Sequence, residues 1–382
     1  MVNYVKLGDI GEIFIGLTYK PENVSTEGMI VLRSSNIQDG ELDFNDTVRV
    51  NCPVRENLLV KPNDILMCSR NGSAKLVGKC TMLPRMSEPM TFGAFMTIIR
   101  TPYNSYLRYF FDSSAFRNQI KGSATTTINQ ITRKMLDEIE VPVFDVESQI
   151  RITTQFEKLS KLIAMRKEQL AKLDELVKAR FVEMFGDSLH NRNTVSLEEI
   201  SDFVTVGIAN SATHAYADSG IVMLRNQNIK ENYLDDNDLI YITPDFAKKY
   251  GSKQLAENDI LVIRTGYPGV ACLVPKKYEG CQTFTTLIVR LKNSTPAHTN
   301  YVCHYINSSF GKGYVEQSKV GVAQQNFGAK ALAKMPIAVP PMELQEQFAA
   351  FVEQTNKTKL TIQASLDKLE VMKKALMQEY FG

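Results

Sequence analysis

The chain has 382 residues, of which 44% are hydrophobic and 23% charged, and its formal net charge is +2. This length leaves room for two or three domains with sizeable cores, and no apolar run reaches the ~18–20 residues that a membrane helix requires. The near-neutral charge disfavours a protein that binds nucleic acid through an overall basic excess, because phosphate neutralisation supplies much of that affinity. A local basic patch or a basic partner subunit would be compatible with it.

The start of the chain and its cysteines narrow the class of protein further. Residues 1–10 lack the basic stretch followed by an apolar one that a secretory signal shows, so we expect a cytoplasmic protein that does not engage a membrane. None of the six cysteines forms a Cys-x-x-Cys pair, the close spacing that structural zinc prefers. The composition therefore predicts free, partly buried thiols and no metal site.

The first ~140 residues contain short β-like runs that are broken by turn signals. A helix is expected around residues 103–120, so the segment predicts a mixed α/β or β-rich domain. The same kind of pattern returns in residues 187–342. The β-like runs include residues 65–68, 95–100, 260–263 and 287–291.

Residues 148–185 predict one long helix, because they contain neither Gly nor Pro and repeat apolar residues every seven positions. Residues 343–382 show a similar pattern. Such heptads indicate a coiled-coil seam, and the Phe-Gly that closes each segment predicts the helix end, since Gly is favoured just past it. The predicted seam residues are Phe156, Leu159, Ile163, Leu170, Leu173, Val177, Phe348, Phe351, Ile362, Leu369, Met372 and Leu376.

An internal repeat organises the chain. Short motifs of the first half return in the same order in the second half, at a nearly constant offset of 190–198 residues. This period is too long for a solenoid, so we interpret the chain as a duplicated pair of domain and helix. Examples are residues 30–37 and 222–229, 63–66 and 258–261, 97–100 and 287–290, and 183–186 and 379–382.

The repeat predicts how the helices run. If the two copies pack with pseudo-two-fold symmetry, the second helix returns towards the first domain, which makes the helices antiparallel and brings Gly382 near that domain. A heptad helix after a domain is more often a plain packing or dimerisation element. Its occurrence twice, with matched lengths and ends, favours a spacer.

Several motifs resemble, in order, those of a known family. Residues 121–129, 136–142 and 147–150 look like the exit of a target recognition domain into a conserved helix, and residues 335–342 with 346–347 are similar to a proline–proline–leucine and glutamate–glutamine signature. The resemblance covers essentially the whole chain and is to the specificity (S) subunit of type I restriction–modification systems. The other motifs that fit are residues 6–10, 63–66 and 324–327.

One departure concerns the entry into the first helix. The chain has Val143-Phe144-Asp145 where a second proline and a leucine are usual in that family. A less sharply defined entry into the first helix is therefore expected there.

The resemblance implies an α/β fold (mixed, α+β) with two target recognition domains joined by two long antiparallel coiled-coil helices. Each domain would bind one half of a bipartite site in double-stranded DNA. The helices would set the spacing and dock two methyltransferase (M) subunits, which bind S-adenosylmethionine, and restriction/motor (R) subunits would join for cleavage. The implied segments are 1–146 and 187–342 for the recognition domains and 147–186 and 343–382 for the helices.

The chain lacks the motifs of an enzyme of this kind. Its only Pro-Pro, Pro340-Pro341, stands outside the Asn/Asp-Pro-Pro-aromatic context of adenine methyltransferases, and no Walker loop is present. We therefore expect no catalytic residue and no cofactor on this chain. The alternatives are an independent nuclease or methylase, a scaffold with two protein-binding domains on a coiled coil, and the specificity subunit of a related bipartite-site system.

The candidate DNA contacts lie in three pairs of loops, in which Arg can pair bidentately with guanine, Asn with adenine, and small residues allow close approach to phosphate. Each loop also fits a plainer structure: a tight Arg-x-Gly turn, a strand end with Asx turns, or an ordinary surface loop. The candidates are Arg33, Ser34, Asn36, Gln38, Arg70, Asn71, Ser73, Lys75, Lys121, Thr125, Thr126, Arg225, Asn226, Gln227, Asn228, Arg264, Thr265, Tyr267, Lys319, Gln324, Gln325 and Asn326.

Overall fold

The computed structural model describes residues 3–38, 40–122, 129–189, 194–209, 213–319 and 326–382. The chain divides into two compact units: unit 1 comprises residues 1–167 and 364–382, and unit 2 comprises residues 168–363. Each unit therefore contains one sheet-rich domain and part of each long helix. Among the described helices, none combines the length and the apolar character needed to span a bilayer.

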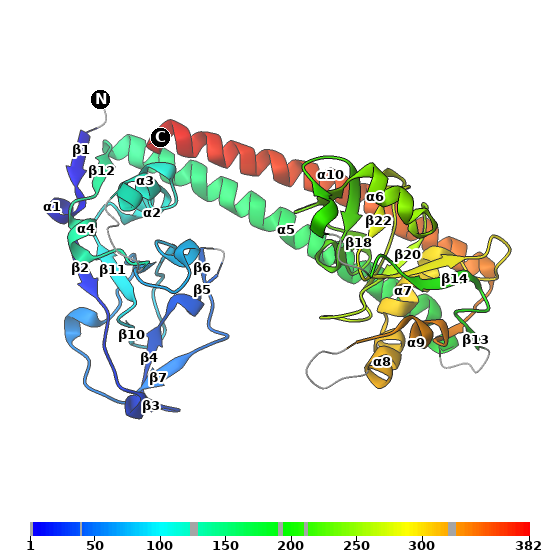
Figure 1. The fold of residues 1–382 in the computed structure, drawn as a ribbon. Helices are drawn as coiled ribbons and strands as arrows, with labels where there is room; N and C mark the ends of the chain where they lie inside the picture. Colours follow the sequence, from blue (N-terminus) through cyan, green and yellow to red (C-terminus); the bar gives the residue numbers. More distant parts are fainter. Residues whose placement is uncertain (1–2, 39, 123–128, 190–193, 210–212, 320–325) are drawn as a thin grey trace. The chain divides into compact units, whose positions relative to one another are not determined.

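The two halves of the chain share one order of strands, and each half contains one short helix, α1 or α6, that the other lacks (Figure 1). The first half contains β1 (Asn3–Lys6), α1 (Leu7–Ile10), β2 (Glu12–Ile15), β3 (Val24–Ser25), β4 (Met29–Leu32), β5 (Ile37–Gln38), β6 (Glu41–Leu42), β7 (Val48–Val50), β8 (Ile65–Cys68), β9 (Cys80–Met82), β10 (Met90–Phe92), β11 (Met96–Arg100), α2 (Asn104–Phe110), α3 (Ser114–Gly122), α4 (Arg133–Asp137), β12 (Glu140–Val143) and α5 (Val146–Leu189). The second half contains β13 (Thr194–Ser196), β14 (Ser201–Val206), β15 (Tyr216–Ala217), β16 (Ile221–Leu224), β17 (Ile229–Lys230), β18 (Tyr233–Leu234), β19 (Ile240–Ile242), α6 (Pro244–Lys249), β20 (Ile260–Val262), β21 (Ala271–Leu273), β22 (Gln282–Thr283), β23 (Leu287–Leu291), α7 (Thr299–Asn307), α8 (Ser309–Ser318), α9 (Ala329–Ala333), β24 (Pro336–Ala338) and α10 (Met342–Phe381).

The sheets repeat strand for strand. The order β2-β11-β8-β9 in the first half is matched by β14-β23-β20-β21, and the order β10-β4-β7-β3 is matched by β22-β16-β19-β15. Even the parallel pairs correspond, since β10 runs parallel to β4 and β22 runs parallel to β16. The mixed fold and the duplication predicted from the sequence are confirmed.

The first long helix has a well-defined entry despite its missing proline. The backbone N–H of Ser148 donates to Asp145 Oδ1 and the Ser148 hydroxyl donates to Oδ2, both at 2.8 Å. These hydrogen bonds satisfy donors at the helix start, and they lower the pKa of the Asp145 carboxyl. The expectation of a less sharp entry is therefore wrong, because an acidic cap replaces the proline.

The end of the first helix also differs from the prediction. Helix α5 continues through Gly186 to Leu189, whereas α10 ends at Phe381, directly before Gly382. A glycine ends a helix when it adopts a left-handed conformation, and Gly186 is not among the residues with positive φ. Because Gly186 does not adopt the left-handed conformation, α5 continues past it.

Inside each unit the two long helices pack antiparallel. In unit 1 the ring of Phe156, near the start of α5, lies 6.1 Å from that of Phe381, at the end of α10. In unit 2 the ring of Phe185, near the end of α5, lies 5.5 Å from that of Phe348, near the start of α10. The predicted antiparallel pairing and the return of the chain end to the first domain are confirmed.

The predicted seam residues of α5 are all buried or half-buried, whereas the predicted set on α10 needs one correction. Met372 is 54% exposed and is not a seam residue, whereas Leu366, which was not predicted, is 5% exposed. Leu366 follows Ile362 by four residues and precedes Leu369 by three, which keeps all three on one face. Met372 lies six residues, about 600° of rotation, beyond Leu366 and therefore points away from that face.

Buried His304 on α7 gives unit 2 a pH-dependent stability. Its ring lies 5.0 Å from that of Phe348, and burial lowers the pKa of His304 from 6.5 to about 4. Below pH 6.5 the unfolded chain binds a proton that the folded unit resists, so stability falls as the pH drops from 6.5 towards 4. At pH 5 we expect a loss of about 2 kcal/mol relative to pH 7.

The test is urea unfolding of the wild type and of His304→Gln at pH 7 and pH 5. The variant should lose less stability between the two pH values, by about the same 2 kcal/mol. An equal loss in both proteins would contradict this assignment.

Candidate nucleic-acid interface

Three predicted loops converge in unit 1. Residues 33–36 follow β4, residues 69–77 follow β8, and residues 129–130 precede α4. The Asn71 side-chain amide donates to Ser34 Oγ at 3.2 Å, which joins the first two loops. The third loop is joined by the β-bridge between Arg70 and Gln130. We call these three segments loop cluster 1.

Unit 2 repeats this arrangement in residues 225–228, 264–268 and 326, which we call loop cluster 2. The Asn226 side-chain amide donates to the Thr265 carbonyl oxygen at 3.2 Å. Thr265 forms a β-bridge with Asn326, and Arg264 Nε donates to Asn326 Oδ1 at 3.0 Å. The structure thus brings the three predicted loops together in each unit.

The two loop clusters correspond residue by residue, but their correspondence is one residue away from the one that would superpose the two Arg-x-Gly motifs, which begin at Arg70 and Arg264. The backbone N–H of Ile131 donates to the Ser69 carbonyl at 2.8 Å, and the N–H of Phe327 donates to the Arg264 carbonyl at 2.9 Å. Ser69 therefore corresponds to Arg264, not to the residue before it. The two loops therefore occupy equivalent places, as predicted, but the strand register matches Arg70 with Thr265 and not with Arg264.

Asn36 and Asn228 have a structural role. Both are fully buried. Asn36 Nδ2 donates to the carbonyl of Asp43 at 2.8 Å, and Asn228 Nδ2 donates to that of Asn237 at 2.8 Å. Their Oδ1 atoms accept the backbone N–H of Arg33 and Arg225. In this conformation neither amide is available to a base. The prediction that Asn36 and Asn228 contact DNA is therefore wrong.

Several other candidates are also held within their own unit. Arg33 forms an ion pair with Asp46 at 2.7 Å, and Arg225 donates to the Asp238 carbonyl. Lys319, whose side chain is 12% exposed, pairs with Glu316. These contacts compete with a role in DNA binding and would have to exchange for it.

The remaining candidates differ in how far they reach solvent. The exposed ones are Gln38, Arg70, Ser73, Lys75, Lys121, Gln227 and Tyr267. The half-buried ones are Ser34, Asn71, Asn226, Arg264, Thr265 and Asn326. Thr125, Thr126, Gln324 and Gln325 lie outside the described residues.

Sequence reasoning missed Phe95, which lies in the turn before β11. Its side chain is 58% exposed, and the Arg70 guanidinium carbon lies 5.3 Å from its ring centroid. The sequence counted it as the start of a β-like run. The sequence signal that could have identified it is its position directly after Gly93-Ala94, which places a large apolar residue in a turn and not in a strand.

All six cysteines are free, and burial raises the pKa of Cys80, Cys272 and Cys303, which keeps these thiols protonated. Among the described residues no group of His, Cys, Asp or Glu has the arrangement of a metal site.

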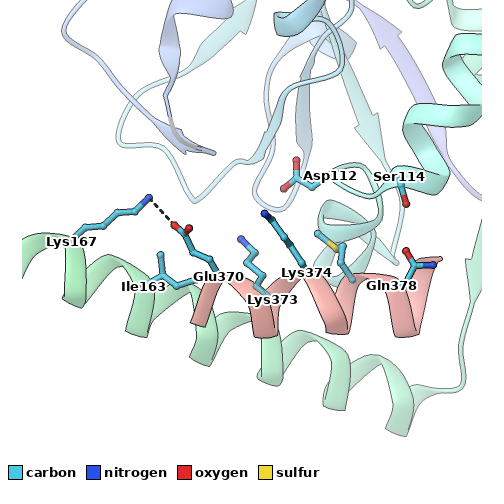
Figure 2. A pocket seen from close by; sticks show the side chains of 9 residues that line it. Asp112, Ser114, Ile163, Lys167, Glu370, Lys373, Lys374 and Gln378 are labelled. Atoms are coloured by element: carbon cyan, nitrogen blue, oxygen red, sulfur yellow. Dashed lines mark ion pairs between the residues drawn. The ribbon is translucent and has the colours of Figure 1, made fainter. Parts of the chain in front are cut away.

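A groove of about 500 Å³ lies in unit 1 beside the helix pair (Figure 2). Figure 2 shows Lys373 and Lys374 of α10 on the side of Asp112, and an ion pair between Lys167 and Glu370 at 3.9 Å. The groove is formed by the two long helices and the segment between α2 and α3, and none of its lining residues belongs to the three loops of cluster 1. It therefore contributes no residue to the candidate interface.

Comparisons with known proteins agree with this architecture. Residues 191–371 match the family model described as the type I restriction modification DNA specificity domain. The chain is 22% identical to the type I restriction enzyme EcoKI specificity subunit of Escherichia coli K12 and 25% identical to the StySPI specificity subunit of Salmonella potsdam, in each case over 89% of this chain and 78% of the relative.

Two solved structures share the fold. One is a chain from a study of complex assembly and conformational transition in the type I R-M system, with a TM-score of 0.57 and 15% identity over 100% of this chain and 97% of that chain. The other is the type I S subunit from M. genitalium, with a TM-score of 0.55 and 12% identity over 100% and 96%. The second half of the chain thus matches the type I DNA specificity domain, and the chain as a whole is similar in sequence to type I specificity subunits and shares their fold.

Proposed function

We propose that this chain is the specificity subunit of a type I restriction–modification system and that it recognises a bipartite site in double-stranded DNA, with loop cluster 1 contacting one half-site and loop cluster 2 the other. The observation that carries the proposal is the duplicated convergence of hydrogen-bonding loops in two units of the same fold. Donors and acceptors on adjacent loops are what base edges and phosphates require. The loops differ in sequence between the copies, which suits two different half-sites.

The long helices serve, in this proposal, as the attachment for two methyltransferase (M) subunits and as the spacer. Exposed apolar side chains along them support a protein partner: Leu162, Met165 and Leu176 on α5 and Leu360 and Val371 on α10 are 44–71% exposed. S-adenosylmethionine would bind to the M subunits and not to this chain. Restriction/motor (R) subunits would join the same complex for cleavage.

The near-neutral net charge fits a subunit that binds DNA as part of a complex. With 44 Lys and Arg against 42 Asp and Glu, the chain has little overall attraction for phosphate. The partner subunits would then supply much of the contact with the DNA backbone, and this chain would supply the base contacts. The chain itself would be a non-catalytic, recognition-only component.

The test is genome-wide mapping of adenine methylation in cells with and without this chain. We expect one split motif to disappear when the chain is absent and to return with a plasmid copy. Unchanged methylation would oppose the proposal. A purified complex of the chain with its M subunits that binds DNA without sequence preference would favour a scaffold instead.

A further inference from the structure

One strongly exposed aromatic ring accompanies each loop cluster. Phe95 is 58% exposed and Tyr267 is 83% exposed, which makes them the most exposed aromatic side chains in the described part of the chain. Rigid aromatic rings at a surface are typical of binding contacts, because they offer a large area at a low entropic cost. Their position at the clusters, one in each unit, calls for a functional explanation.

Phe95 is held rigidly beside a cation. Its carbonyl oxygen accepts the backbone N–H of Ser69 at 2.9 Å, the backbone N–H of Arg70 at 3.1 Å and the Ser69 hydroxyl at 3.1 Å. The Arg70 guanidinium carbon lies 5.3 Å from the centroid of the Phe95 ring. The turn is therefore fastened to loop cluster 1, and the ring stands in solvent although its backbone is fixed.

Phe95 has no counterpart in unit 2. Gly93 corresponds to Phe284, because the backbone N–H of each donates to the carbonyl at the end of the neighbouring strand. Met96 corresponds to Thr286, because the backbone carbonyl of each accepts a hydrogen bond from an equivalent glycine. Two residues lie between Gly93 and Met96, but one lies between Phe284 and Thr286. The turn of unit 1 is longer by one residue.

Tyr267 in turn has no aromatic counterpart in unit 1. It lies in a short loop between β20 and β21, where Gly266 and Gly269 adopt φ values of +86° and +92° that hold the turn tight. The corresponding loop of unit 1, residues 69–77, contains no aromatic residue. In the described part of the chain each cluster thus presents one strongly exposed aromatic ring, and the two clusters take it from different loops.

We propose that Phe95 and Tyr267 are specificity-determining residues, each contacting bases of one half-site. This inference rests on the proposed function of the clusters. Apolar and aromatic side chains discriminate bases through contact with groups such as the thymine methyl. The strand framework is the same in both units, so residues that differ between the copies, these two rings among them, are able to give each half-site its own identity.

The test uses the complete complex of this chain with its M subunits. Binding is measured by fluorescence anisotropy on three duplexes: the mapped motif, the motif with its first half altered, and the motif with its second half altered. Phe95→Ala should weaken binding to the mapped motif 10-fold or more and remove discrimination at the half-site that belongs to unit 1. Tyr267→Ala should do the same at the other half-site.

Matched controls are Tyr4→Ala and Tyr216→Ala, which remove rings that are 53% and 43% exposed outside the clusters. They should leave binding and discrimination within twofold of the wild type. Thermal unfolding of each variant should match the wild type, because the removed rings are exposed.

Two results would overturn the inference in distinguishable ways. If the wild-type complex itself does not discriminate among the three duplexes, the proposed function fails, and this inference fails with it. If the wild type discriminates but Phe95→Ala and Tyr267→Ala retain its specificity ratios within twofold, the role of the two rings alone is refuted.

Discussion

Replacing Asp64 by Asn should lower the free energy of unfolding of unit 1 by roughly 3–5 kcal/mol. Asp64 is 1% exposed, and its two oxygens accept Arg100 Nε at 2.7 Å and Arg100 Nη2 at 2.6 Å. The guanidinium carbon also lies 4.9 Å from the ring centroid of Phe14. The substitution removes the carboxylate charge and leaves a largely buried guanidinium without its partner, which is why a large cost is expected.

The same ion pair occurs in unit 2 between Asp259 and Arg290, with both hydrogen bonds at 2.7 Å. The Arg290 side chain is 33% exposed, against 19% for Arg100. Solvent can therefore compensate Arg290 better, and Asp259→Asn should cost less than Asp64→Asn. Urea denaturation of the full chain, followed for each variant, measures both effects.

The matched control is Glu88→Gln, which breaks the pair with Arg49 at 2.9 Å, where both side chains are more than 30% exposed. Such a surface pair contributes at most about 1 kcal/mol. A cost for Asp64→Asn as small as that of the control would show that the buried pair does not stabilise the fold.

Phe381→Ala should cost roughly 3–5 kcal/mol, the usual effect of removing a buried aromatic ring. Phe381 is 1% exposed, and its ring lies 5.9 Å from that of Phe110 and 6.1 Å from that of Phe156. It fastens the end of α10 to α2 and to the start of α5. Its loss should release the last turns of α10 from unit 1, and limited proteolysis should then cut there first.

Met372→Ala is the control for this prediction. It lies on the same part of α10 but is 54% exposed, so its removal should change stability by less than about 0.5 kcal/mol. Equal costs for the two variants would mean that α10 does not pack as described. If Met372→Ala lowered the free energy of unfolding more than Phe381→Ala, Met372 would be a seam residue, as the heptad pattern predicted.

The sequence predicted the duplication well because the framework residues recur as short motifs. The Asn-Asp-Ile-Leu motif, for example, returns with Asp64 and Asp259 in the same buried ion pair. The helix seam was harder to predict, since α10 has apolar residues at neighbouring positions such as 351–352 and 371–372. Only the packing partner decides which of two adjacent residues is buried.

The candidate interface shows a different limit of sequence reasoning. Asn36 and Asn228 have the residue type of an adenine contact, but their amides satisfy buried backbone carbonyls. Both roles use the same donors and acceptors, so residue type alone cannot separate them. The one-residue shift between Arg70 and Arg264 was likewise hidden, because it depends on strand register. Phe95 was missed because an aromatic residue in a turn resembles the first residue of a strand.

The division of recognition between the two units is tested by exchanging residues 1–146 for the recognition domain of a type I specificity subunit and mapping the methylated motif of the resulting complex. If each loop cluster recognises its own half-site, one half of the motif changes and the other half is retained. A motif in which both halves change, or neither does, would show that recognition is not divided between the two units.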